Sequence, residues 1–136
     1  MNPIIAHIRQ LYGDACRLCP PLEQTAYEQA GIALPEELLA LLRESNGILE
    51  LMPELTANDG GPLVSGWVVY PLDEIRSNTA YYANAYGGAG TVFAGNGAGG
   101  YFLLMPDGTV WLKEFFDEDA ERYAESLTAF FGRWHG

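Results

Sequence analysis

Residues 95–111 constrain the fold of this chain more than any other stretch, because a glycine cluster there leads into two apolar runs. The glycine-rich segment 95–100 precedes the apolar run 101–104, and the tripeptide Pro-Asp-Gly at 106–108 separates it from a second apolar run that ends near Phe115. Apolar runs joined by a short turn that contains Asp-Gly are typical of a β-hairpin. We therefore expect a flexible loop that leads into a hairpin.

The same glycines match a nucleotide-binding pattern, since Gly95, Gly97 and Gly100 have the spacing G-x-G-x-x-G. A dinucleotide site needs a helix directly after the glycines, whereas an apolar, strand-like run follows here. A kinase-type glycine loop needs a lysine on a later strand together with HRD and DFG motifs; Lys113 is the only lysine, and neither motif is present. We therefore favour a structural loop and expect no nucleotide, metal or other cofactor.

The charge balance excludes two classes of partner. The chain has 18 acidic and 7 basic residues among 136, for a net charge of −11. Nucleic acids and anionic membrane surfaces would both be repelled, because both are bound through lysine and arginine. Two interpretations stay open: the charge keeps a small protein soluble, or it steers a basic protein partner toward it.

Two further observations concern the compartment and the cysteines. The first nine residues lack a basic leader and no segment is long enough to span a membrane, so we expect a cytoplasmic protein. Cys16 and Cys19 form a lone C-x-x-C, and the two histidines, His7 and His135, lie at opposite ends of the chain. A structural zinc site needs four ligands, so we expect two free thiols.

The order of the predicted elements indicates an α+β fold with an antiparallel β-sheet flanked by helices, in a single domain over residues 1–136. Apolar spacing and stop signals predict helices over 3–13, 22–30, from Pro35 to Asn46-Gly47, and from Asp73 to Tyr86, where Ile75, Tyr82 and Tyr86 share one face. Strands are expected over 48–52, 67–70 and 91–94, with 16–21 a linker and 53–66 a loop. The acidic run at 117–119 is expected to open a last helix.

The core and the chemistry follow from these elements. Ten side chains are expected in the core: Leu38, Leu41, Leu42, Trp67, Val69, Phe102, Leu104, Trp111, Leu127 and Phe130. Ser126 falls inside the predicted last helix without a G-x-S-x-G motif, and no nucleophile stands beside a base. We therefore expect a binding protein and not an enzyme.

Four segments, in this order, resemble motifs of the SUKH superfamily (SMI1/KNR4-like). They are Leu22–Gly47 with its Leu-Pro and Asn-Gly, Tyr70–Ile75, the glycine loop with its hairpin, and Ala124–Phe131. The resemblance spans residues 22–131, which makes the helix over 3–13 an extra element. Two positions depart from the family's pattern: Gly100-Tyr101 stands where Gly-Asp is frequent, and Asn96 where an acidic residue is frequent.

The resemblance implies a non-enzymatic immunity protein that binds and neutralises a cognate polymorphic or contact-dependent bacterial toxin. Many such toxins act on nucleic acids as nucleases or deaminases, and a basic nuclease would complement a charge of −11. An intracellular regulatory or scaffold domain is the alternative, and a small ligand-binding or enzymatic domain that uses the glycine loop is a second one. The oligomeric state stays open.

Two regions combine acidic residues with an aromatic side chain and are the candidate partner-binding sites. The first is the helix that Asp73 and Glu74 open, with Tyr81 off its buried face. The second is the acidic run Asp117, Glu118, Asp119 and Glu121. Charge speeds association, and buried aromatic anchors supply most of the affinity of an interface. The competing interpretation is that both acidic clusters only complement helix dipoles.

Overall fold

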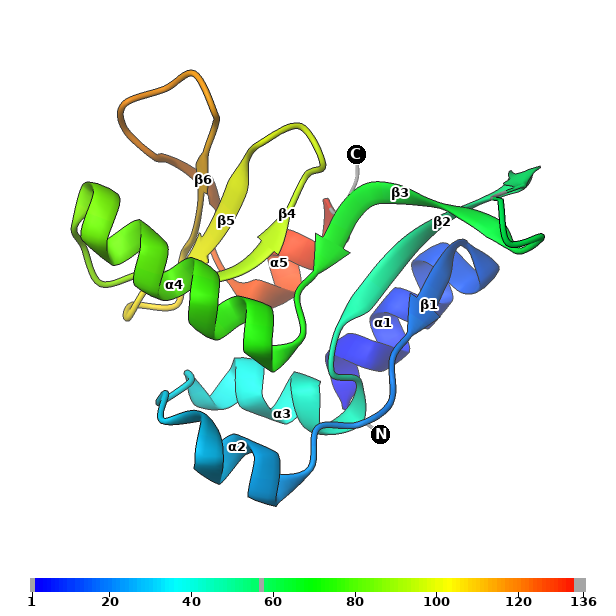
Figure 1. Cartoon of the computed structure of the whole chain (residues 1–136), viewed down its shortest axis with the longest axis horizontal. Coiled ribbons are helices and arrows are strands. Elements are labelled where there is room, and N and C mark those ends of the chain that lie inside the picture. Colours follow the sequence, from blue (N-terminus) through cyan, green and yellow to red (C-terminus); the bar gives the residue numbers. More distant parts are fainter. Residues whose placement is uncertain (1, 57, 134–136) are drawn as a thin grey trace.

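A computed structural model describes residues 2–56 and 58–133 and has one antiparallel sheet of seven strands in sequential order (Figure 1). This confirms the predicted α+β class. The helices are α1 (Pro3–Tyr12), α2 (Gln24–Ala30), α3 (Glu36–Glu44), α4 (Leu72–Tyr86) and α5 (Leu127–Gly132), with a 3-10 turn η1 (Gly13–Ala15). The strands are β1 (Cys16–Leu18), β2 (Ile48–Thr56), β3 (Pro62–Val69), β4 (Thr91–Gly95), β5 (Tyr101–Leu104), β6 (Val110–Lys113) and β7 (Glu121–Ala124).

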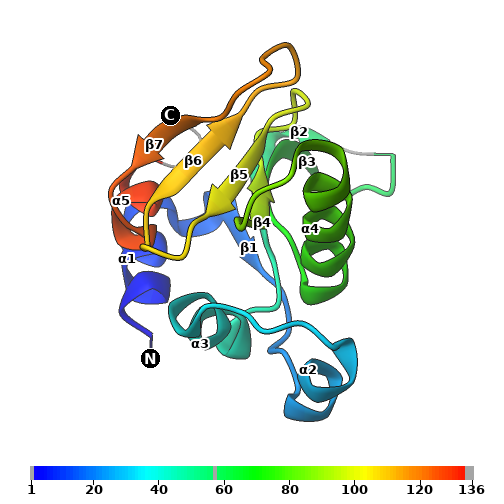
Figure 2. The ribbon, with the colours of Figure 1, turned by 90° about the vertical axis from the view of Figure 1, so that its left-hand side faces the viewer.

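Helices cover both faces of the sheet, with α4 on one side and α1 and α5 on the other (Figure 2). Successive strand residues point to opposite faces, so each central strand serves two clusters. Phe102 and Leu104 join the large cluster that includes α1, α3 and α5, whereas Leu103 packs with Val92 and Tyr82 of α4. The order of helices, strands and a closing helix thus yields a sheet buried on both faces.

Eight of the ten side chains expected in the core are buried; the exceptions are Trp67 and Trp111. Trp111 pairs with Leu103 in the register of β5 and β6, so it faces the smaller cluster and stays partly exposed. Trp67 packs on Phe102, with 5.4 Å between ring centroids, at the edge of the large cluster. The isoleucines of α1, which include the fully buried Ile8, also belong to that cluster.

The predicted last helix is wrong at its start, because no helix begins at Asp117. Residues 121–124 form β7, which pairs with β6, and α5 begins only at Leu127. The hydroxyl of Ser126 accepts a hydrogen bond from the amide of Ala129 at 3.0 Å, so this serine caps the helix and does not lie within it. Pairing with β6 outweighs the local helix signal of the acidic run.

Two further segments are strands where the sequence predicts irregular chain. Residues 16–18 of the expected linker pair with 48–50 of β2. Residues 53–56 and 62–66 of the expected loop belong to β2 and β3, which form the long hairpin at the right of Figure 1. The register of that hairpin shifts between Met52 and Thr56, around Pro53. A proline has no N–H to donate to a ladder, which accounts for an irregular register at this point.

Candidate functional site

The end of α4, the glycine loop and the loop after β6 enclose a hollow of about 310 Å³. We call it the aromatic hollow; it is lined by Tyr81, Tyr86, Gly99, Tyr101, Lys113, Glu114 and Phe115. A second hollow, lined by Phe116, Asp117, Glu118, Asp119 and Glu121, continues along the same loop, which stands above α4 in Figure 1. The rings of Phe115 and Phe116, 5.2 Å apart, join the two. We call both hollows together the aromatic-acidic surface.

The exposed aromatic residues of the described part of the chain gather on this surface. Among the described residues, the exposed aromatic side chains are Tyr81, Tyr86, Phe115 and Phe116, which are 59%, 52%, 70% and 89% exposed. The other large hydrophobic side chains exposed to a comparable degree are Leu11 and Leu55. Apolar side chains exposed singly are ordinary, whereas contiguous exposed apolar patches are typical of interaction sites.

The helical geometry of α4 explains two of these side chains. Ile75 and Tyr82 are buried, so the neighbouring Tyr81 turns outward, as the sequence predicts. The prediction that Tyr86 shares the buried face is wrong. Tyr86 packs on Tyr82 with 5.0 Å between ring centroids, but it lies in the last turn of α4, directly before Gly87 ends the helix, and remains half exposed.

The glycine loop forms one wall of the hollow, where Gly99 packs against Phe115. The side-chain carbonyl of Asn96 accepts hydrogen bonds from the amides of Ala98 at 2.9 Å and Gly100 at 3.0 Å. Gly99 has φ +89°, and a Cβ there would lie 3.0 Å from the Cβ of Phe115. Since close backbone approach and positive φ both require glycine, the cluster serves local packing around an asparagine-centred turn.

Lys113 ties the acidic loop to α4. This side chain is only 4% exposed, and its ammonium donates hydrogen bonds to the carbonyl oxygens of Glu114, at 2.8 Å, and Asp117. It also lies 4.9 Å from the centroid of the Tyr86 ring. A buried charge needs such partners to offset its lost hydration. The loop that carries the acidic residues is therefore held in place from within.

The structure places Tyr81 of the first candidate region beside the acidic run of the second region, and away from Asp73 and Glu74. Tyr81 faces the aromatic hollow, next to the acidic run of the second region. Asp73 and Glu74 occupy the first turn of α4, about 10 to 12 Å along the helix axis from Tyr81, where they complement the helix dipole. That interpretation no longer applies to Asp117, Glu118 and Asp119, because no helix begins there.

Sequence reasoning missed Tyr86, Phe115 and Phe116. A usable signal was present at the end of β6, where Phe115-Phe116 directly precede the acidic run. Aspartate and glutamate side chains are almost never buried unless they are paired, so a run of three of them favours an exposed segment and exposed neighbours. Proximity to acidic residues also shows in Tyr82, whose hydroxyl pKa is raised by burial, by Tyr86 and by the charge of Asp119.

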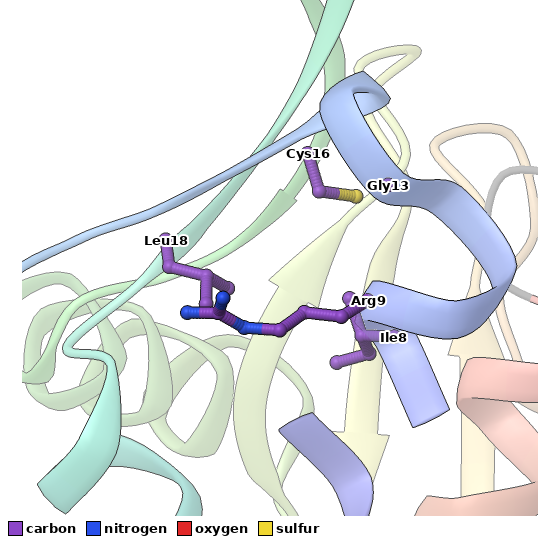
Figure 3. A pocket seen from close by; sticks show the side chains of 5 residues that line it. All are labelled: Ile8, Arg9, Gly13, Cys16 and Leu18. Carbon is purple, nitrogen blue, oxygen red and sulfur yellow. The ribbon is translucent and has the colours of Figure 1, made fainter. Parts of the chain in front are cut away.

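A separate cavity of about 230 Å³ lies between α1 and β1, lined by Ile8, Arg9, Gly13, Cys16 and Leu18 (Figure 3). The Arg9 side chain extends along it toward Leu18. Burial, with a smaller contribution from Glu50, raises the pKa of the Cys16 thiol to about 12. The thiol is therefore protonated at neutral pH and a poor nucleophile. Cys16 and Cys19 are not joined by a disulfide.

Over residues 2–56 and 58–133, no group of three or more histidine, cysteine, aspartate or glutamate residues is placed to hold a metal ion. His135 lies outside these ranges. No helix within the same ranges combines the length and apolar character needed to cross a membrane.

Burial of Cys16 has a consequence for alkaline stability. The raised pKa of its thiol means that the unfolded chain loses this proton from about pH 9.0, while the folded chain retains it to about pH 12. The free energy of unfolding falls with rising pH wherever the folded state binds more protons than the unfolded state. It should therefore decline as pH rises above 9. We expect Cys16→Ala to make the decline between pH 8 and pH 10 shallower, as measured by urea denaturation. An unchanged slope in this variant would contradict the assignment, whatever its absolute stability.

The fold and the site define a small acidic α+β domain whose one antiparallel sheet presents an aromatic-acidic surface at the end of α4. A sequence profile of the SMI1 / KNR4 family (SUKH-1) matches residues 24–133, and the chain belongs to this family. None of the curated proteins matches the chain. The profile begins at Gln24, so α1 and β1 precede the matched region, although both pack against its core.

Proposed function

We propose that this protein is a non-enzymatic immunity protein of the bacterial cytoplasm, which binds a cognate polymorphic or contact-dependent toxin and blocks it. The observation that carries the proposal is the gathering of the exposed aromatic side chains beside an acidic loop. Aromatic anchors surrounded by charged residues are the usual composition of a binding hot spot. Membership of the SUKH-1 family supports this role, because immunity proteins are well represented in it.

The charge of the surface favours a basic toxin, such as a nuclease. Residues 113–121 contain five acidic residues and one lysine, and the whole chain carries −11. A nuclease needs positive charge to hold the phosphate backbone of its nucleic-acid substrate. An acidic inhibitor therefore both attracts the nuclease and competes with that substrate. Lys113 holds the backbone of the acidic loop through the carbonyl oxygens of Glu114 and Asp117.

The test is co-expression with the C-terminal domain of a large multidomain gene that lies next to the gene of this protein, where the genome has one. We expect the full chain to restore growth and to co-purify with the toxin domain. A toxin that still kills in the presence of folded protein would contradict the immunity role. Stable co-purification with a non-toxic intracellular protein instead would favour the regulatory alternative.

Neutralising the acidic loop should slow association. We expect Asp117→Asn, Glu118→Gln and Asp119→Asn together to lower the association rate with the toxin domain at low salt by about tenfold or more, and to weaken its salt dependence. The matched control, Glu28→Gln with Glu36→Gln and Glu37→Gln, removes the same charge from α2 and α3, which lie at the other end of the molecule (Figure 1). Equal rates for the two triple variants, measured by stopped flow, would remove the acidic loop from the interface.

A further inference from the structure

The lining of the aromatic hollow has the chemistry that recognises a cation. Tyr81, Tyr101 and Phe115 offer aromatic rings, and Glu114 offers a carboxylate. A ring face attracts a cation through its quadrupole, and a carboxylate pairs with it directly. At about 310 Å³ the hollow lies at the lower end of small-molecule sites, which suits one side chain better than a nucleotide.

The protein already uses one ring of this hollow in that way. The ammonium of Lys113 lies 4.9 Å from the centre of the Tyr86 ring, and carbonyl oxygens take its hydrogen bonds. Tyr86 is thereby committed to an internal cation, whereas Tyr81 is 59% exposed and Phe115 70% exposed. The positive charge of Lys113 is outweighed by the five acidic residues that follow it up to position 121.

The carboxylate of Glu114 lies beside the asparagine-centred turn of the glycine loop. The side-chain amide of Asn96 donates to one of its oxygens at 3.5 Å, and Asn96 is itself fixed by the amides of Ala98 and Gly100. Within the described part of the chain, no lysine or arginine side chain reaches ion-pair distance of this carboxylate. A half-buried carboxylate beside exposed rings favours a planar guanidinium, which stacks on aromatic faces and is less strongly hydrated than an ammonium.

We propose that the aromatic hollow takes an arginine side chain of the toxin, stacked on Tyr81 and Phe115 and paired with Glu114. This inference rests on the proposed function for the identity of the partner. It goes beyond that function by naming the side chain that enters the surface. The acidic loop then serves long-range attraction, and the hollow fixes the register of the complex.

The experiment uses a tripeptide in place of the toxin, so its result is independent of toxin binding. The ¹⁵N-labelled protein is titrated with acetyl-Gly-Arg-Gly-amide and with its citrulline twin, which has the same shape but no charge. Binding is followed by the NMR chemical shifts of the backbone amides. With the arginine peptide, we expect saturable chemical-shift changes at residues 81, 99–101 and 113–115. With the citrulline peptide, we expect binding at least about tenfold weaker. Equal binding of the two peptides, or shift changes confined to 117–121, would overturn the proposal.

Two pairs of variants sharpen this test. Glu114→Gln keeps an acceptor for Asn96 and should weaken peptide binding at least about tenfold, whereas Glu74→Gln at the far end of α4 should not. Gly99→Ala would push Phe115 into a new position, whereas Gly108→Ala has the same φ of +89° and open space around it. Loss of peptide binding is expected in the first of each pair alone; parallel behaviour within either pair would contradict the assigned site. If the peptide binds as expected but the protein does not protect against the toxin, the arginine site in the hollow is supported and the immunity role is contradicted.

Discussion

Replacing Phe130 with alanine should lower the free energy of unfolding by about 3–5 kcal/mol. Phe130 is fully buried in α5 and packs at the centre of an aromatic cluster. Its ring centroid lies 4.8 Å from that of Phe102, 5.0 Å from that of Phe131 and 5.1 Å from that of Phe93. Truncation removes these contacts and leaves a cavity between α5 and the sheet, where three large rings cannot all move to fill it. Urea denaturation followed by tryptophan fluorescence measures the loss.

Phe116→Ala is the matched control, because it is the same truncation at a side chain that is 89% exposed. The Phe116 ring packs on Phe115 in the loop after β6. A surface substitution of this kind changes stability by about 0.5 kcal/mol or less. If Phe130→Ala and Phe116→Ala unfolded at the same urea concentration, the placement of α5 against the sheet would be wrong.

The elements that the sequence predicts correctly are those whose signals are local. The helix α1 follows from the apolar spacing of Ile4, Ile5 and Ile8 and from Gly13, at φ +50°, as its end; the structure adds the Asn2 side chain as its N-cap. The β5–β6 hairpin follows from two apolar runs around Asp107-Gly108. Each of these signals lies within about a dozen residues, where spacing and turn chemistry act without help from the rest of the chain.

The elements that it misses are formed by pairing between distant segments. The strand at 16–18 exists because β2 offers it an edge some thirty residues later, and β7 exists because β6 offers one. Neither segment has a strong strand pattern of its own, so propensity and composition indicate a linker and a helix start. Tertiary pairing outweighs local preference in both places.

The candidate site is predictable only in part for a related reason. The exposure of Tyr81 follows from the helical period, since its neighbour Tyr82 is on the buried face. The neighbourhood of Tyr81 does not follow from it, because Gly99 and Phe115 reach the end of α4 through the topology of the sheet. The acidic run was recognised as a candidate, but its helix-dipole explanation could be dismissed only once β7 was seen to replace the helix start.

Replacing Tyr81 with alanine should weaken toxin binding by about 2 kcal/mol or more, which is roughly a thirtyfold increase in Kd. Tyr81 is 59% exposed on a rigid helix, so binding can bury a large ring at little entropic cost. The loss should be in the dissociation rate, because the substitution leaves the charge unchanged. The triple substitution in the acidic loop should act on the association rate instead. Surface plasmon resonance with the immobilised toxin domain resolves both rates.

Leu11→Ala is the control for Tyr81→Ala, since Leu11 is a 47% exposed apolar side chain on α1, on the opposite face of the sheet from α4. It should leave both rates unchanged. Neither variant should lower the free energy of unfolding by more than about 1 kcal/mol, because both side chains project into solvent. If Leu11→Ala weakened the complex and Tyr81→Ala did not, the interface would lie on the α1 face. The two kinetic effects together test whether the aromatic-acidic surface is the toxin interface. An aromatic anchor slows dissociation and a charged loop speeds association, so an interface on this surface should lose both when both are replaced.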